Sequence, residues 1–247
     1  MKPVILIPTY NESISIVELL TKLSSLHSLR DFDVVVLDDN SPDHTADIVD
    51  SMNFPWVSVL RRPGKTGLGA AYRAGFSHVL AMQKYSHIVT MDADGSHRVE
   101  DLPSMLDASK DRLSITLGTR WMPGGSVVNW PKSRQLLSRA GTRYARFALG
   151  IPLNDLTGGF RVYSADLLKS LKLNEMTATG YCFQIEMAMA AEIAGATAYE
   201  VPITFVERRE GVSKMSNRIV LEAMVQVTRW GLTRKLSPSA DKLHYVK

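Results

Sequence analysis

The sequence predicts an α/β protein whose mostly parallel sheet is covered by helices on both faces. In the N-terminal half, short runs of β-branched and aliphatic residues alternate with stretches that repeat apolar residues at helical spacing. Polar clusters follow several of the apolar runs, at the points where strands would end. Alternation of strand and helix at this spacing favours a parallel sheet that is buried on both sides.

The first 118 residues contain five predicted strands separated by four predicted helices. Residues 13–26 are typical of these helices, because Ile16, Leu19, Leu20 and Leu23 recur at helical spacing. In chain order we expect a strand at 4–8, a helix at 13–26, a strand at 34–37, a helix at 45–52, a strand at 57–60, a helix at 67–82, a strand at 88–91, a helix at 99–108 and a strand at 113–118.

The second half has a less regular pattern. Prolines and glycines predict a loop over residues 122–131, and paired glycines predict a turn at 154–159. Further along the chain we expect helices at 134–149, 181–194 and 218–233, strands at 160–163 and 198–205, and a charged loop at 207–216. We expect one domain over residues 1–235, followed by a basic tail over 236–247. We expect residues 237–247 to be loosely ordered.

The composition limits the class of protein. The chain has 247 residues, of which 45% are hydrophobic and 22% charged, as expected for a folded chain with a single core. A lone cysteine, Cys182, excludes an internal disulfide framework and a cysteine-only zinc site. We find no apolar run long enough for a transmembrane helix and no signal peptide pattern, so we expect a cytoplasmic protein.

Positive charge is concentrated at the C-terminal end. The formal net charge is +4, yet residues 208–247 contain nine basic and three acidic residues, so the first 207 residues are slightly acidic. A cationic segment of this kind suits phosphates, nucleic acid or an anionic membrane surface, and the alternative is a solvated basic helix without a partner. No nucleic-acid-binding motif accompanies it, which disfavours nucleic acid.

Three polar clusters, at residues 9–12, 38–41 and 92–94, follow predicted strands and should meet at one edge of the sheet. Asp92 and Asp94 supply the oxygen ligands that Mg²⁺ or Mn²⁺ prefers, whereas the alternative is a solvated acidic turn. Tyr10 could stack on a base and Glu12 could accept hydrogen bonds from a base or a ribose. The alternative for that segment is a helix N-terminus capped by Asn11.

Other polar residues have weaker signals. Residues 61–69 place cations and glycines before a helix, which is compatible with phosphate binding or with a simple helix entry, but the P-loop spacing is not met. Cys182 reads as a core residue, and His97 as a site residue or as part of a solvated turn. Cations that would suit a phosphate, or else surface ion pairs, are Arg120, Arg134, Arg208, Arg209 and Lys214.

Motifs along nearly the whole chain, from about residue 3 to 235, resemble glycosyltransferase family 2, and within it the dolichol-phosphate (polyprenyl-phosphate) mannosyltransferases. The early motifs are shared across the family, and the later ones are more specific to the lipid-phosphate branch. The matching segments are residues 8–12, 38–43, 64–69, 92–97, 118–120, 130–134, 157–161, 180–186 and 205–214.

The resemblance implies a GT-A fold and an inverting transfer of mannose from GDP-mannose to dolichol or polyprenyl phosphate, with Mg²⁺ or Mn²⁺. It also implies roles for individual residues. Nucleoside-binding positions are Pro8, Tyr10, Glu12, Leu37 and Asp39; diphosphate and metal positions are Asp92, Ala93 and Asp94, with Ser96 in the metal shell; holders of the acceptor phosphate or donor are Arg120, Arg134 and Ser138; phosphate-contacting positions of the late loop are Arg208 and Lys214.

The chain departs from the family pattern at His44, Gly95, Trp121 and the pair Arg98-Val99, which bears on detail of the metal shell. No general base is evident, and an acceptor phosphate needs none because it is already anionic. Alternatives are a family 2 enzyme that uses UDP-glucose or a soluble acceptor, and a non-catalytic nucleotide-sugar-binding subunit. We expect residues 218–247 to attach the enzyme to the cytoplasmic face of a membrane or to a membrane-embedded subunit, or else to pack on the core.

Overall fold

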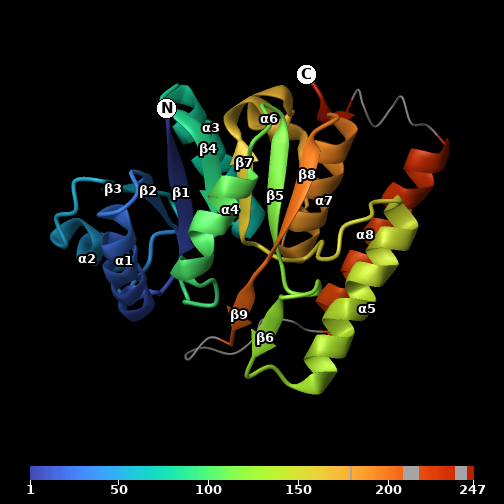
Figure 1. The fold of residues 1–247 in the computed structure, drawn as a ribbon, viewed down its shortest axis with the longest axis horizontal. Helices are drawn as coiled ribbons and strands as arrows, with labels where there is room; N and C mark the ends of the chain where they lie inside the picture. Colours follow the sequence, from blue (N-terminus) through green and yellow to red (C-terminus); the bar gives the residue numbers. More distant parts are fainter. Residues whose placement is uncertain (179, 208–216, 237–243) are drawn as a thin grey trace.

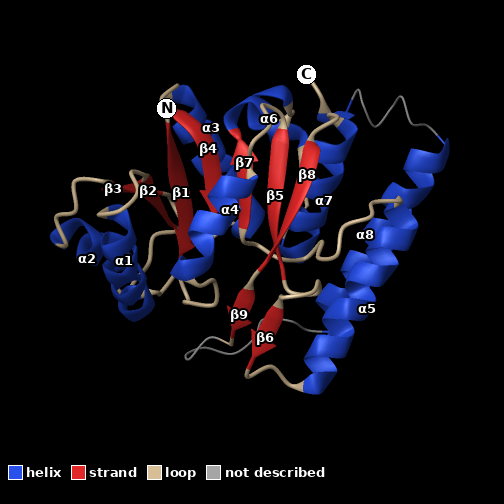
Figure 2. Cartoon of the chain, viewed as in Figure 1, coloured by secondary structure: helices blue, strands red, loops and turns tan. Residues whose placement is uncertain are grey.

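The computed structural model describes residues 1–178, 180–207, 217–236 and 244–247 (Figures 1 and 2), without the side chains of Tyr181 and of residues 217–222. Its centre is a seven-stranded sheet in which only β7 runs antiparallel to its neighbours, so the predicted α/β class is confirmed. The strand order is β3 (Val57–Arg61), β2 (Asp33–Asp38), β1 (Lys2–Thr9), β4 (Tyr85–Thr90), β7 (Arg161–Ser164), β5 (Ser114–Thr119) and β8 (Thr197–Pro202).

Helices cover both faces of this sheet, as predicted. In β1 the side chains alternate: Val4 and Leu6 enter one core cluster, while Ile5 and Ile7 enter the other. The first cluster is covered by α3 (Leu68–Ala81), α5 (Lys132–Leu149), α6 (Ala165–Ser170), α7 (Gly180–Ile193) and α8 (Asn217–Leu236); the second by α1 (Ser13–His27), α2 (Thr45–Ser51), η1 (Val99–Asp101) and α4 (Leu102–Ala108).

A second, two-stranded sheet changes the predicted second half. Strand β6 (Ser126–Val128) lies inside the predicted loop, and it pairs with β9 (Thr204–Val206). The single strand predicted over residues 198–205 is wrong, because Ile203 separates β8 from β9: its N–H bonds to Thr119 in the large sheet and its C=O to Ser126 in the small one. The short α6 and η2 (Leu173–Glu175) were not predicted.

Helices α5 and α8 lie side by side at one edge of the molecule (Figure 1). They approach closely at Gly231, where an added Cβ would lie 2.4 Å from the carbonyl oxygen of Ala148. None of the described helices combines the length and apolar character needed to cross a bilayer.

The end of the described chain returns to the core. Tyr245 is buried, its carbonyl accepts a hydrogen bond from the N–H of Lys172 at 2.9 Å, and Val246 forms a bridge with Leu171. The expectation of a loosely ordered tail is therefore wrong for residues 244–247, while residues 237–243 lie outside the described residues. The division of the chain at residue 235 stays a prediction.

Candidate active site

The loops after β1, β2 and β4 meet at one edge of the sheet, because these strands are parallel neighbours. Asp38 joins two of the loops by accepting hydrogen bonds from Thr9 Oγ1 at 2.9 Å and from Ser41 Oγ at 2.6 Å. Ser41 Oγ in turn accepts the backbone N–H of Asn11 at 3.1 Å. Asp38 thus holds the edge together, and the next residue, Asp39, is the candidate ligand-binding carboxylate.

Asp39 forms a largely buried ion pair with Arg62, whose Nη2 also donates to Thr66 Oγ1 at 2.6 Å. Burial raises the pKa of the Asp39 carboxyl above its ordinary value, although the Arg62 charge opposes the shift. Arg62 is a site residue that sequence reasoning did not single out; its position in the cationic segment at residues 61–69 was the available signal. A carboxylate fixed in this way can accept hydrogen bonds from a ribose or a base.

Tyr10 and Glu12 lie at the same edge, and each makes a contact within the chain. Lys65 Nζ lies 4.0 Å from the centroid of the Tyr10 ring, and Glu12 Oε2 accepts a hydrogen bond from Ser15 Oγ at 2.7 Å. The alternative that Asn11 caps the first helix is wrong, because Glu12 is the residue before α1 and makes no side-chain cap bond. Asn11 has a left-handed backbone, with φ of 59°.

Pro8 and Leu37 are paired in register across β1 and β2. The Leu37 side chain is fully buried in the core, and a Cβ at Gly75 would lie 2.7 Å from its Cδ1. Only the backbone of Leu37 is therefore available to a ligand at this edge.

The metal motif alternates between the core and the edge of the sheet. Ala93 is 3% exposed and packs in the second core cluster, so Asp92 and Asp94 are placed together outside it. Asp94 Oδ1 accepts the backbone N–H of Ser96 at 3.0 Å, across a left-handed Gly95 with φ of 73°. The glycine that departs from the family pattern thus forms the turn that orients Asp94.

His97 is a buried part of this turn, so the expectation of a solvated turn is wrong. Its Nδ1 accepts the backbone N–H of Asp92 at 3.0 Å, and its ring stacks on Phe160 with centroids 5.0 Å apart. Phe205 meets the same ring edge-on at 5.5 Å. The aromatic contacts hold the backbone of Asp92 in place and join the motif to β9.

The donor set at this turn fits a divalent cation that is completed by the substrate. No group of three or more His, Cys, Asp and Glu side chains able to hold a metal occurs among the described residues. Asp92 and Asp94 therefore offer two hard oxygen ligands, which suits Mg²⁺ or Mn²⁺ bound also by diphosphate oxygens and water. Ser96 is 2% exposed, which leaves its place in the metal shell a prediction.

Arg120, predicted to hold a phosphate, is buried and paired. Its Nε and Nη2 donate to the two carboxylate oxygens of Asp155 at 2.6 and 2.8 Å, and Nη2 also donates to Thr157 Oγ1 at 2.9 Å. Burial alone would raise the pKa of Asp155, but the charge and hydrogen bonds of Arg120 hold it below its ordinary value. Sequence reasoning missed Asp155. Its carboxylate accepts hydrogen bonds from the N–H groups of Thr157 and Gly158, and an aspartate at the start of a glycine-containing turn was the available signal.

Arg134 is brought to the same place as Arg120 by an aromatic ring. The Arg134 guanidinium lies 4.0 Å from the Trp130 ring centroid, that of Arg120 lies 5.3 Å from it, and Arg134 forms an ion pair with Glu207. Ser138 lies one turn further along α5, and its buried Oγ has no hydrogen-bond partner among the described residues. Arg208 and Lys214, the predicted phosphate contacts of the late loop, lie outside the described residues.

A further buried arginine, Arg161, lies beneath the site. It donates to the carbonyls of Leu156, Gly158 and Gln184 at 2.9, 2.9 and 2.5 Å, which fixes the segment between Asp155 and β7 against α7. The motif at 157–161 contained this residue, but nothing in the sequence showed that its partners would be backbone carbonyls.

Comparison with known proteins gives the class. The model of the family "Glycosyl transferase family 2" matches residues 4–172, more than half of the chain. The chain therefore belongs to glycosyl transferase family 2, and its resemblance to that family is confirmed.

Two curated relatives define the branch of the family. An undecaprenyl-phosphate mannosyltransferase of Micrococcus luteus is 46% identical over 95% of this chain and 96% of its own length. A polyprenol monophosphomannose synthase of Mycolicibacterium smegmatis is 41% identical over 95% of this chain and 89% of its own length. The resemblance to polyprenyl-phosphate mannosyltransferases is thereby confirmed.

Solved structures agree on the fold. Glucosyl-3-phosphoglycerate synthase from Mycobacterium tuberculosis, in complex with Mn²⁺, UDP and glucosyl-3-phosphoglycerate, matches with a TM-score of 0.64 at 19% identity, covering 95% of this chain and 79% of that one. Mannosyl-3-phosphoglycerate synthase from Rubrobacter xylanophilus matches with a TM-score of 0.66 at 16% identity, covering 97% and 75%. The expected GT-A fold is confirmed.

Proposed function

We propose that this enzyme transfers mannose from GDP-mannose to a polyprenyl phosphate, with inversion at the anomeric carbon, giving polyprenyl phosphate mannose and GDP. The observation that carries the proposal is the arrangement of two chemically different halves at one edge of the sheet. The metal motif and Asp39 lie on one side, and Arg120, Arg134 and Ser138 lie on the other, joined through His97 and Phe205.

The reaction needs alignment and charge stabilisation more than proton transfer. An oxygen of the acceptor phosphate attacks the anomeric carbon while the bond from that carbon to the diphosphate of GDP-mannose breaks. The acceptor is already an anion at neutral pH, so no general base is required. The chain's work is to hold two negatively charged reactants in line at short distance.

Each half supplies part of that work. Asp92 and Asp94 would hold Mg²⁺ or Mn²⁺, which neutralises the charge on the leaving diphosphate when it is bound. Arg134 and Ser138, one turn apart on α5, are placed to bind the acceptor phosphate. Arg120 adds a positive group that Asp155 holds rigidly beside them, so little reorganisation is needed during transfer.

The acceptor's lipid chain requires contact with a membrane, and we propose that α8 provides part of it at the cytoplasmic face. Helix α8 carries exposed apolar side chains together with the exposed cation Arg229. This combination is typical of helices that lie in a membrane interface. The exposed apolar residues are Met224, Val225, Leu232 and Leu236.

The test is a transfer assay with purified protein, Mg²⁺ or Mn²⁺, a polyprenyl phosphate in detergent and either labelled GDP-mannose or labelled UDP-glucose. We expect label in the organic phase from GDP-mannose and none from UDP-glucose, and none from either donor with Asp94→Asn. Label from UDP-glucose alone would overturn the donor. Transfer only to a soluble phosphorylated acceptor would overturn the lipid.

A further inference from the structure

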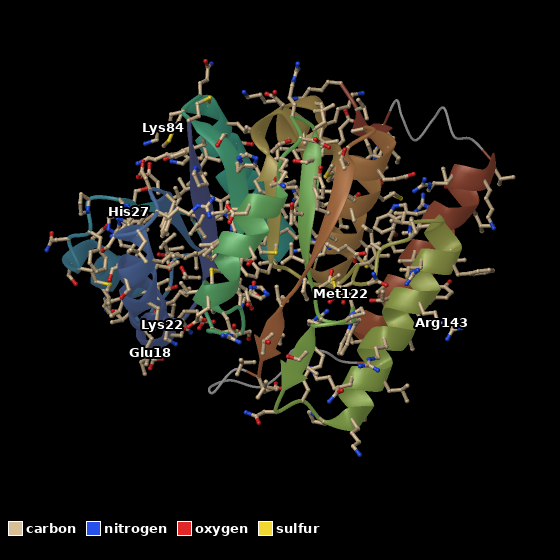
Figure 3. The ribbon with its side chains drawn as sticks, in the orientation of Figure 1. Glu18, Lys22, His27, Lys84, Met122 and Arg143 are labelled. Carbon is tan, nitrogen blue, oxygen red and sulfur yellow. The ribbon has the colours of Figure 1, made fainter. Side chains whose placement is uncertain are left out.

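A second cationic site lies on α5, next to the proposed transfer site. A pocket of about 790 Å³ opens between the middle of α5, the segment after β5 and the turn after α5, and none of its lining residues is an Asp or a Glu. Figure 3 labels two of the lining residues, Met122 near the end of β5 and Arg143 on α5. The chain has 25 acidic residues, yet none of them lines this pocket, so the charged residues of the lining are all positive.

The excess comes from three exposed arginines. Arg139, Arg143 and Arg146 follow one another at spacings of four and three residues, so they share one face of the helix. Among the described residues none of the three pairs with a carboxylate, and Arg146 donates only to the side-chain oxygen of Asn154 at 3.2 Å. Like charges at these spacings repel, so the arrangement weakens the helix unless an anion neutralises it.

The pocket also contains buried donors with nothing to bind. Thr142 is 4% exposed, and its Oγ1 has no hydrogen-bond partner among the described residues; the same holds for the buried Nε1 of Trp121. Both residues line the pocket, and the Arg139 guanidinium lies 4.7 Å from the Trp121 ring centroid. Guanidinium, indole N–H and hydroxyl groups together suit an oxyanion such as a phosphate.

This pocket adjoins the acceptor-phosphate site but uses different cations of α5. Arg139 lies five residues after Arg134, and Arg143 lies five residues after Ser138. Five residues correspond to roughly 140° around the helix, so the two arginines face a different direction from Arg134 and Ser138. Arg120 lines the pocket and also belongs to the proposed acceptor side, so the two sites adjoin at this residue.

We propose that this pocket binds the phosphate of an anionic membrane phospholipid and so orients the enzyme on the bilayer. A lipid is favoured over a free phosphate because Phe147, 82% exposed, lines the pocket, and Leu136 on the same helix is 71% exposed. Exposed apolar side chains beside uncompensated arginines match an anionic headgroup with acyl chains beneath it. The choice of a lipid rests on the proposed membrane-bound acceptor, whereas the anion site itself does not.

The first experiment is co-sedimentation of the full-length protein with phosphatidylcholine vesicles and with vesicles that also contain phosphatidylglycerol. Arg139→Gln/Arg143→Gln should bind the anionic vesicles roughly thirty-fold more weakly than the wild type. Each cation near an anionic surface strengthens binding by about five- to six-fold, and the variant lacks two of them. The charge-matched control is Lys22→Gln/Lys110→Gln, an exposed lysine on α1 and an exposed lysine that follows α4, which should bind within about two-fold of the wild type. An equal loss in the control would overturn the site.

A second variant separates a built pocket from diffuse attraction. Thr142→Val keeps the charge and shape but removes the hydroxyl, and it should weaken binding to the anionic vesicles roughly three- to ten-fold. Unchanged binding by Thr142→Val would overturn the pocket in favour of diffuse charge. Binding of inorganic phosphate without preference for phosphatidylglycerol vesicles would overturn the lipid.

A third measurement distinguishes this site from the catalytic one. With a short-chain, water-soluble polyprenyl phosphate, Arg139→Gln/Arg143→Gln should keep the wild-type KM and kcat. A raised KM for that acceptor would place the arginines in the acceptor site and overturn the inference. Because vesicle binding needs no turnover, a failure of the proposed transfer reaction would leave the binding result interpretable.

Discussion

The two sides of the proposed active site are held together in different ways. The donor side consists of the loops at residues 9–12, 38–45 and 91–97, and its bonds are mostly between acids and nearby hydroxyl or backbone groups, as at Asp38 and Asp94. The acceptor side consists of residues 119–121, 130–138 and 154–158, and its cations are neutralised by acids far along the chain. On the proposed donor side most of these bonds shape the loops after the strands, whereas on the proposed acceptor side they pair buried or half-buried charges.

The largest effect on activity should come from the donor side. Asp94→Asn keeps the size of the side chain but removes the charge that would hold the cation against the leaving diphosphate. We expect kcat to fall by roughly 1,000-fold, measured with saturating GDP-mannose over a range of Mn²⁺ concentrations. Asp107→Asn, at an exposed acid on α4, should retain wild-type kcat. Activity within ten-fold of wild type for Asp94→Asn would contradict the donor role.

The largest effect on stability should come from the acceptor side. Asp155→Asn leaves Arg120 buried without its counter-charge, and breaking a buried pair in this way costs about 3–5 kcal/mol of the free energy of unfolding. Urea unfolding followed by circular dichroism measures the loss.

The matched control is Asp166→Asn, which breaks the exposed pair with Arg112 and should cost less than about 1 kcal/mol. Equal losses for Asp155→Asn and Asp166→Asn would show that the Arg120–Asp155 pair does not fix the acceptor side.

Arg134→Gln tests whether the two sides act on different substrates. Losing a charged hydrogen-bond donor to phosphate should lower kcat/KM for the polyprenyl phosphate roughly 10- to 100-fold, while the KM for GDP-mannose stays unchanged. Arg62→Gln, which frees Asp39 on the donor side, should raise the KM for GDP-mannose instead. The measurement is steady-state kinetics with each substrate varied in turn. If both variants changed the KM for the same substrate, the assignment of the two arginines to separate sides would be contradicted.

The same difference explains how much the sequence could predict. The donor side follows from strand positions, because residues after parallel strands must meet at one edge, and Tyr10, Asp39, Asp92 and Asp94 were all placed there correctly. The mostly parallel α/β sheet followed from the same local alternation of strand and helix.

The acceptor side depends on contacts that local patterns do not contain. Asp155 lies 35 residues from Arg120 and Glu207 lies 73 residues from Arg134, and neither spacing leaves a periodic signal. The break at Ile203 has the same origin, since β9 pairs with β6, 78 residues earlier, and also bridges His97. For His97 the sequence left a site residue and a solvated turn as alternatives, and only the distant Phe160 and Phe205, which cover its ring, exclude the solvated turn.

The smallest predicted effect concerns pH and a buried acid on α7. Burial raises the pKa of Glu186 above its ordinary value, although the N–H of Ala178 and the hydroxyl of Tyr245 donate to its carboxylate at 3.1 and 3.4 Å. The folded state therefore binds the proton more tightly than the unfolded state does. Protonation of Glu186 therefore favours the folded state below the ordinary pKa of about 4.3. This stabilisation is lost as the pH rises through the pKa that Glu186 has in the folded state.

Glu186→Gln removes this titration and keeps a carbonyl to accept the N–H of Ala178. The variant should therefore gain stability relative to wild type between pH 4 and pH 7, by about 1.4 kcal/mol for each unit by which the pKa is raised. Asp155, whose pKa is lowered, acts in the opposite sense: it stabilises the fold above its unfolded pKa and loses that effect in acid. Urea unfolding at several pH values measures the difference, and Glu192→Gln, at an exposed pair with Arg234, should run parallel to wild type. If the free energy of unfolding of Glu186→Gln also followed that of the wild type at every pH, burial of the Glu186 charge would cost a negligible free energy. The contrast between Glu186 and Asp155, which is paired with Arg120, would then fail.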